Sequence, residues 1–149
     1  MNILISSCLL GLYCRYDGKC KAYPQIEELL RRSDIQFIPV CPEQAGGLAT
    51  PRPPAERRGS RVVTKGGMDV TAAYEQGART ACHLAKLFHC DYAVLKEKSP
   101  SCGCGTIYDG TFTRTLTSGN GVTAEHLKAQ GISIVGEQSL HKLLSILEK

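Results

Sequence analysis

The chain has 149 residues and a net charge of +4, and 42% of its residues are hydrophobic. This length predicts a single domain over residues 1–149, which can bury a core without disulfide bonds. The charge is too small to indicate a DNA partner, although it is compatible with an anionic small molecule. No apolar run approaches the ~20 residues of a membrane helix, and residues 3–12 lack the basic start of a signal peptide. We therefore expect a cytoplasmic protein without a membrane partner.

Short apolar segments alternate with amphipathic ones along the chain, which predicts an α/β fold with a mostly parallel sheet. In chain order, we expect a strand at 2–6, a helix at about 24–32, a strand at 36–40, a helix that is capped by Asp69 or Thr71 and runs to about Phe88, a strand at 92–97, a helix at 121–130, a strand at 132–135 and a helix at 137–147. Residues 42–68 are dense in Pro, Gly and Arg and are expected to form a long irregular loop, which is often functional. Residues 106–117 are compatible with a short strand or a hairpin.

Three of the eight cysteines follow predicted strands closely, namely Cys8, Cys41 and Cys102. Ligands of parallel sheets gather at the carboxyl ends of the strands, so we expect these thiols to meet in one crevice. Thiols in the cytosol stay reduced, which favours metal binding or catalysis over disulfide formation. The other cysteines are expected to fill the core, as for Cys82 and Cys90, or have undecided roles, as for Cys14, Cys20 and Cys104.

The wide spacing of the three thiols favours an iron–sulfur cluster. A structural zinc site usually contains paired Cys-x-x-Cys knuckles, whereas the segment from Cys102 to Cys104 is a C-x-C. Thiolates suit iron–sulfur clusters, and a 4Fe-4S cluster held by only three of them keeps one iron free to bind a substrate atom. Such an open iron would act as a Lewis acid.

Six motifs occur in a fixed order between Ile3 and about Val135. They are CLLG at 8–11, CRYDG at 14–18, CPEQ-x-GG at 41–47, PRPPAE at 51–56, LKE-x-SPSCG at 95–103 and IYDG at 107–110. Together they resemble the small bacterial thiouracil desulfurase family. The resemblance implies a Rossmann-like, three-layer α/β domain with an oxygen-sensitive 4Fe-4S cluster, which replaces the thiocarbonyl sulfur of a pyrimidine with oxygen.

The resemblance also implies roles for individual residues. It implies that Cys8, Cys41 and Cys102 bind the cluster, and the strand-end argument selects the same three. Glu43 corresponds to the family's acid/base residue, and Ser99 to a serine that positions or protonates the substrate. In the implied reaction, the thione sulfur coordinates the open iron, water attacks the ring carbon and sulfide leaves without net redox change. Composition alone would instead favour a backbone-bonded Glu43 and a turn-forming Ser99.

Several alternatives remain open. The substrate could be a thiolated uracil base, a nucleoside or a phosphorylated nucleotide, and the basic run in the 42–68 segment is either a solvated loop or a phosphate clamp. A zinc-binding structural or sensor protein would use Cys8, Cys41, Cys102 and Cys104. A sulfur carrier would use a cysteine persulfide without metal. The basic run comprises Arg52, Arg57, Arg58, Arg61 and Lys65.

Overall fold

The computed structural model describes residues 1–148, and its centre is a four-stranded parallel sheet with the strand order β2-β1-β5-β8. Its strands are β1 (Asn2–Ser6), β2 (Gln36–Val40), β5 (Tyr92–Leu95) and β8 (Ser133–Gly136). The first two match the predicted strands to the residue, because their apolar segments are short and clearly bounded. The predicted α/β fold with a mostly parallel sheet is confirmed.

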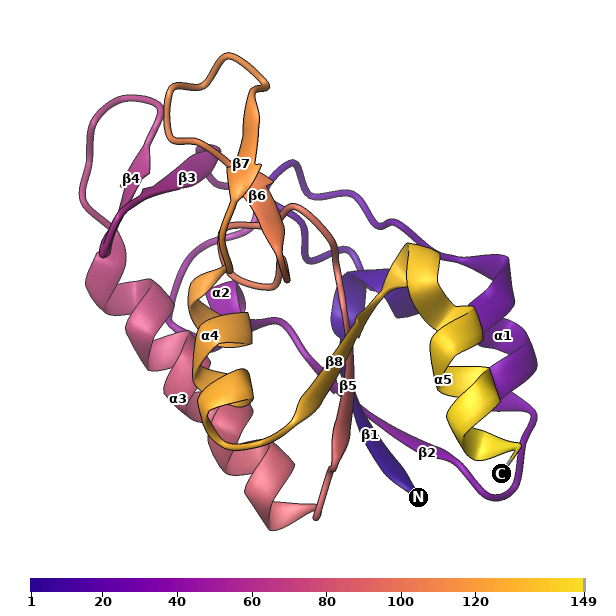
Figure 1. Cartoon of the computed structure of the whole chain (residues 1–149). Helices are drawn as coiled ribbons and strands as arrows, with labels where there is room; N and C mark the ends of the chain where they lie inside the picture. The colour runs from indigo at the N-terminus through magenta and orange to yellow at the C-terminus, as the bar shows by residue number, and fades with distance from the viewer. Residues whose placement is uncertain (149) are drawn as a thin grey trace.

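Helices cover both faces of the sheet and make a three-layer structure (Figure 1). One face carries α1 and α5, and the other carries α3 and α4. The helices are α1 (Pro24–Leu30), α3 (Thr71–Leu87), α4 (Val122–Ala129) and α5 (Leu140–Leu147). The last helix starts three residues later than predicted, because residues Glu137–Ser139 form the 3-10 helix η2. No helix among residues 1–148 is long and apolar enough to cross a bilayer.

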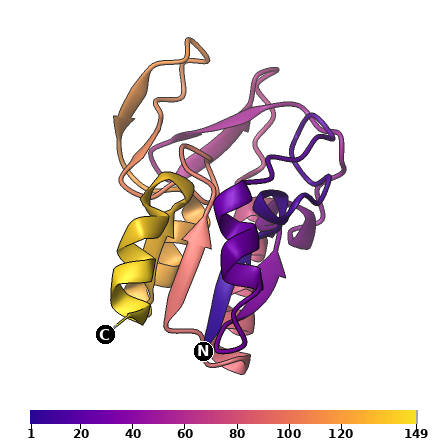
Figure 2. The ribbon, with the colours of Figure 1, turned by 90° about the vertical axis from the view of Figure 1, so that its right-hand side faces the viewer.

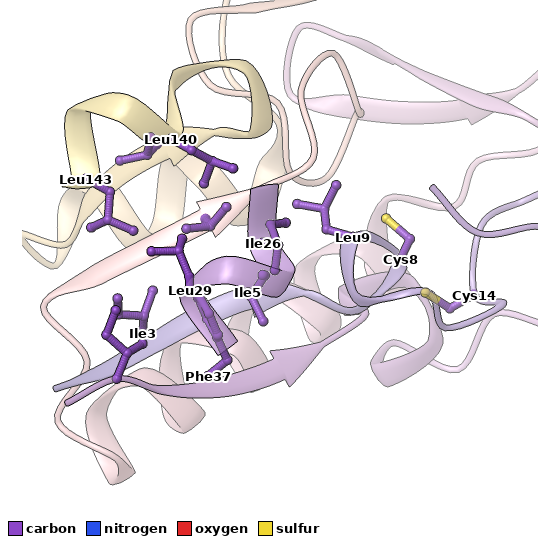
Figure 3. Packing of buried hydrophobic residues seen from close by; sticks show 13 residues of the cluster. Ile3, Ile5, Cys8, Leu9, Cys14, Ile26, Leu29, Phe37, Leu140 and Leu143 are labelled. Atoms are coloured by element: carbon purple, nitrogen blue, oxygen red, sulfur yellow. The ribbon is translucent and has the colours of Figure 1, made fainter. Parts of the chain in front are cut away.

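The alternation of side chains along β1 explains how the sheet joins the two helical layers. Ile3 and Ile5 face the α1/α5 layer, where they pack near Leu29 and Leu143, as Figure 3 shows. Leu4 points to the opposite face and joins the core under α3 and α4. All three β1 side chains are fully buried, as expected for a central strand of a parallel sheet.

The prediction of an irregular loop over residues 42–68 is wrong in part. This segment contains the short helix α2 (Pro42–Ala45) and an antiparallel hairpin of β3 (Ala55–Arg58) and β4 (Arg61–Thr64). The sequence pattern did not predict this hairpin, because β3 is largely charged and only β4 is buried. In β4, Val62 packs against Tyr74 of α3. Burial by a distant helix, rather than local alternation, stabilises it.

A second hairpin resolves the ambiguous segment 106–117. It pairs β6 (Thr106–Tyr108) with β7 (Leu116–Ser118). In Figures 1 and 2, both hairpins lie beyond the carboxyl ends of the sheet strands, on the side opposite the N-terminus. They are therefore placed to form walls above the edge of the sheet where the three cysteines are expected to meet.

Candidate functional site

A cavity of about 650 Å³ lies at the carboxyl ends of the parallel strands. It is lined by segments that follow β1, β2 and β5 and by residues of both hairpins. All five residues singled out from the sequence line this cavity: Cys8, Cys41, Glu43, Ser99 and Cys102. The structure thus brings together side chains that are up to about ninety positions apart in the chain.

Each of the three thiols lies in a segment that follows a strand of the sheet. Cys8 lies in the 3-10 helix η1 (Ser7–Leu10), which begins where β1 ends and stops at Gly11 in the left-handed region, with φ of 92°. Cys41 is the N-cap residue of α2 and directly follows β2. Cys102 lies in the loop after β5 and, like Cys8, is buried. This arrangement is typical of ligand sites in parallel α/β sheets.

Cys14 is a fourth thiol at the cavity, and the sequence left its role undecided. It is buried and lines the cavity, and the side chains of Cys8 and Cys41 both act on its pKa. The Cys41 thiol also donates to the Cys14 carbonyl oxygen, with a sulfur–oxygen distance of 3.6 Å. Figure 3 shows Cys8 and Cys14 together at one end of the hydrophobic core. Only their shared loop, and no motif spacing, could have indicated this contact.

The four-cysteine zinc arrangement does not form in this structure. Cys104 is absent from the cavity lining and packs instead against the core under α3 and α4. Within residues 1–148, no three His, Cys, Asp or Glu side chains are grouped closely enough to hold a single metal ion. Cys82 and Cys90 are buried in the helical layer, as expected for structural cysteines.

Three of the thiols at the cavity, Cys14, Cys41 and Cys102, have raised pKa values. The hydrogen bond with Cys14, together with burial, raises the pKa of Cys41 well above its usual range. Burial, followed by the nearby Glu43 carboxylate, raises the pKa of Cys102 to about 12. The hydrogen bond with Cys41 lowers the pKa of Cys14, but the hydrogen bond with Cys8 and burial outweigh it and raise this pKa to about 11. A bound metal centre would have to displace these protons, because its ligands are thiolates.

Glu43 is held at the cavity by Arg52. The carboxylate lies in the first turn of α2, where its Oε2 accepts a hydrogen bond from the Arg52 guanidinium in a well-buried ion pair, with exposed side-chain fractions of 15% and 6%. Arg52 also donates to the Cys14 carbonyl oxygen at 2.9 Å. The sequence predicted a solvated loop or a phosphate clamp at Arg52, and both interpretations are wrong for this residue. The one sequence feature that could have indicated a role for Arg52 at the site is its position in the PRPPAE motif.

The other arginines of the basic run also have structural partners. Arg57 pairs with Glu125 at 2.8 Å, Arg58 donates to the Gly110 carbonyl oxygen at 2.7 Å, and Arg61 pairs with Asp69 at 2.8 Å. The remaining basic residue, Lys65, lines the cavity. These contacts join the β3–β4 hairpin to α4, to the connection between β6 and β7 and to the segment just before α3, so the run does not form a five-residue phosphate clamp.

Ser99 organises the loop that carries Cys102. Its Oγ accepts hydrogen bonds from the backbone N–H groups of Ser101 and Cys102, both at 3.1 Å. Because the hydroxyl accepts in both contacts, its own hydrogen remains available to a molecule in the cavity. Gly121, at the start of α4, presses on the same loop, since a Cβ there would lie 2.8 Å from the Cys102 nitrogen. The position of Cys102 is thus fixed from two sides.

The close packing of α2 against α3 fixes the other side of the cavity. A Cβ at Gly77 of α3 would lie only 1.8 Å from the Pro42 carbonyl oxygen, so no larger residue fits there. One turn earlier on α3, Tyr74 lines the cavity beside Glu43. No sequence pattern indicated that the polar end of Tyr74 would reach the cavity.

These features define an α/β protein with buried thiols and one ion-paired carboxylate around a cavity at the carboxyl ends of its parallel strands. The model of the 2-thiouracil desulfurase family matches residues 3–139. The chain belongs to this family, as its motifs led us to expect.

Two similar proteins support the assignment. The chain is 41% identical over 152 residues to the uncharacterized protein YbbK of Bacillus subtilis (strain 168), an alignment that covers 95% of this chain and 99% of the other. It is 43% identical to a solved structure, that of the [4Fe-4S]-dependent thiouracil desulfidase TudS, with a TM-score of 0.92. This match covers 99% of this chain and 97% of that one.

Proposed function

We propose that this protein is a [4Fe-4S]-dependent thiouracil desulfidase, which replaces the thiocarbonyl sulfur of a thiolated uracil with oxygen and releases sulfide. The observation that carries the proposal is the meeting of Cys8, Cys41 and Cys102 with Glu43 at one cavity. The family and the similarity to TudS support it. In this proposal, the whole chain acts as one catalytic domain in the cytoplasm.

The residues present fit a cluster better than a single ion. The donors at the cavity are soft thiols, which suit iron–sulfur clusters. The thiolates of a cluster bind different irons and so lie farther apart than the ligands of one zinc ion, in agreement with the absence of a compact single-ion site among residues 1–148. We assign Cys8, Cys41 and Cys102 as the ligands, which leaves one iron without a protein ligand. The chemistry expected from the bound cluster is Lewis-acid polarisation of the thiocarbonyl group and acceptance of its sulfur.

Glu43 is the proposed general base for the attacking water. Its Oε2 is occupied by Arg52, whereas Oε1 accepts no hydrogen bond from residues 1–148 and remains available to a water in the cavity. The ion pair holds the carboxylate in one orientation, which is what proton removal from a positioned water requires. Water then supplies the oxygen that replaces sulfur on the ring carbon, and no net oxidation or reduction occurs.

Ser99 has two proposed roles in this site. Its acceptor contacts fix the turn that presents Cys102, and its free hydroxyl hydrogen can be donated to the substrate. Basic side chains at the cavity would accommodate a substrate that carries a phosphate, so the proposed substrates include the base, the nucleoside and the nucleotide. These lining residues are Arg15, Lys21, Lys65, Lys98 and Arg114.

The proposal is tested with anaerobically reconstituted protein. Wild-type protein should be brown and should release sulfide from a thiouracil or from its nucleotide. Glu43→Ala should keep its iron and colour and lose turnover, whereas Glu28→Ala, an exposed residue of α1, should keep both. Full activity of Glu43→Ala would show that the base assignment is wrong. Absence of sulfide release by an iron-loaded wild type would overturn the function.

A further inference from the structure

Tyr74 is an additional polar side chain in the candidate site. It lies in the first turns of α3, is only 3% exposed and lines the cavity. The charged or ionisable groups that act on its pKa are those of the site itself, including Glu43, Arg52 and Cys102. Burial comes first among the causes that raise this pKa, so the hydroxyl is a neutral donor.

The Tyr74 hydroxyl has no hydrogen-bond partner among residues 1–148. A buried tyrosine hydroxyl usually finds a partner, because leaving it unpaired is unfavourable. Among residues 1–148, the buried side-chain nitrogen or oxygen that has neither solvent contact nor a hydrogen-bond partner is the Arg52 Nε. Because the unpaired Tyr74 hydroxyl does not belong to this class, it keeps some contact with solvent. The cavity that its side chain lines provides this contact.

The packing around the ring fixes the direction of this hydroxyl. The apolar part of Tyr74 packs with Val62 of β4, Ala78 of α3 and Val122 of α4 in a separate small core. Because α3 contacts α2 backbone to backbone at Gly77, the helix cannot shift to give the hydroxyl another partner. The donor is thus held beside Glu43 and the thiols without an acceptor among residues 1–148.

We propose that the Tyr74 hydroxyl donates a hydrogen bond to the exocyclic oxygen of the bound thiouracil. This inference rests on the proposed function and adds a substrate-binding residue to it. Thiouracil has two exocyclic acceptors, and the sulfur is the one that is removed. The remaining carbonyl oxygen is a strong acceptor that loses water on entering the cavity and needs a donor there. A neutral phenol meets this need without adding charge to the site.

The test compares Tyr74→Phe with the wild type on two substrates. Thiouracil keeps one exocyclic oxygen, whereas 2,4-dithiouracil has sulfur, a weaker acceptor, at both positions. The loss of one neutral hydrogen bond should raise KM for thiouracil about five- to tenfold, with a smaller change in kcat. For 2,4-dithiouracil, used as a substrate or as a competitive inhibitor, KM or Ki should hardly change. Tyr92→Phe is the matched control. Tyr92 is the first residue of β5, at the end of the strand away from the cavity, so this variant should resemble wild type for both compounds.

Two further measurements separate this role from a structural one. Tyr74→Phe should keep the iron content and visible spectrum of the wild type, and the Tm of its metal-free form should not fall, because no protein hydrogen bond is lost. An unchanged KM for thiouracil, an equal effect on both compounds, or a changed iron content would overturn the inference while leaving the desulfidase function intact. An iron-loaded wild type that releases no sulfide would remove the function and the inference with it.

Discussion

Arg52 binds Glu43 and, with the same terminal nitrogen, donates to the carbonyl oxygen of Cys14. One guanidinium group therefore joins the proposed base to the loop that carries a fourth cavity thiol. This contact explains why an arginine from a Pro-rich segment is almost fully buried. It also makes Arg52 a positioning residue, since its neighbours line the cavity and its own side chain is absent from the lining.

Removal of Arg52 should strongly destabilise the protein. Arg52→Met would leave the Glu43 carboxylate without its charged partner and the Cys14 carbonyl with only the Cys41 thiol as donor. Breaking a buried pair in this way lowers the free energy of unfolding by about 3 kcal/mol or more. Arg61→Met, which breaks an exposed pair with Asp69, should lower it by less than about 1 kcal/mol. Urea unfolding of the metal-free variants measures both values. Equal losses in the two variants would contradict the importance assigned to Arg52.

An added methyl group at Gly77 should disturb the site from outside it. The new Cβ would meet the Pro42 carbonyl oxygen at 1.8 Å and push α2 away, together with the adjoining Cys41 and Glu43. We expect Gly77→Ala to lower the free energy of unfolding by roughly 1–3 kcal/mol and to reduce iron content after reconstitution. Gly66→Ala is the control, since a Cβ there would meet nothing closer than 4.0 Å. A Gly77→Ala protein with wild-type stability and iron would show that the two helices separate easily.

Ser99 is expected to act on the stability of the Cys102 loop as well as on turnover. Ser99→Ala removes the acceptor of two backbone N–H groups and should lower the free energy of unfolding by roughly 1–2 kcal/mol. Ser99→Thr keeps the hydroxyl and should recover most of this loss. Thermal unfolding of the metal-free proteins is the measurement. If Ser99→Ala loses turnover without any loss of stability, the serine acts only on the substrate.

Asp69 should make the stability of the α3 start dependent on pH. Hydrogen bonds from the Thr71 side chain and backbone, and then from Arg61, lower the pKa of Asp69 from 3.8 to about 2. A carboxyl group whose pKa is lower in the folded state stabilises the fold above pH ~4, and this contribution disappears as the pH falls towards 2. Asp69→Asn should therefore be less stable than wild type at pH 6, and the difference should shrink between pH 4 and pH 2. A difference that stays constant over this range would argue against the assigned titration.

The sequence predicted those parts of the site that depend on strand ends. Cys8 and Cys41 could be placed because the apolar strands before them end abruptly, and parallel strands bring their carboxyl ends to one edge. The wall residues could not be placed in this way. The burial of Arg52 depends on Glu43, and the polar end of Tyr74 depends on how α3 meets α2, so both are tertiary effects that no local pattern encodes.

Cys14 and Cys104 also show that distance along the sequence does not predict which thiols reach the site. Cys104 is two residues from a proposed ligand, yet the chain turns its side chain towards the core under α3 and α4. Cys14 is twenty-seven positions from Cys41, yet the Cys41 thiol donates a hydrogen bond to the Cys14 carbonyl oxygen. Sequence distance alone would thus place Cys104 at the site and leave Cys14 out of it. The structure shows the reverse, because the loop between β1 and α1 brings Cys14 to the strand ends.

The most direct test of the account is the iron and acid-labile sulfide content of single Cys→Ser variants after anaerobic reconstitution. Wild-type protein, Cys14→Ser and Cys104→Ser should each contain about four iron and four sulfide per chain. Cys8→Ser, Cys41→Ser and Cys102→Ser should each lose most of both. Full iron content in any of these three variants, its loss in Cys104→Ser, or a colourless wild type with one zinc per chain would contradict the proposed three-thiolate cluster.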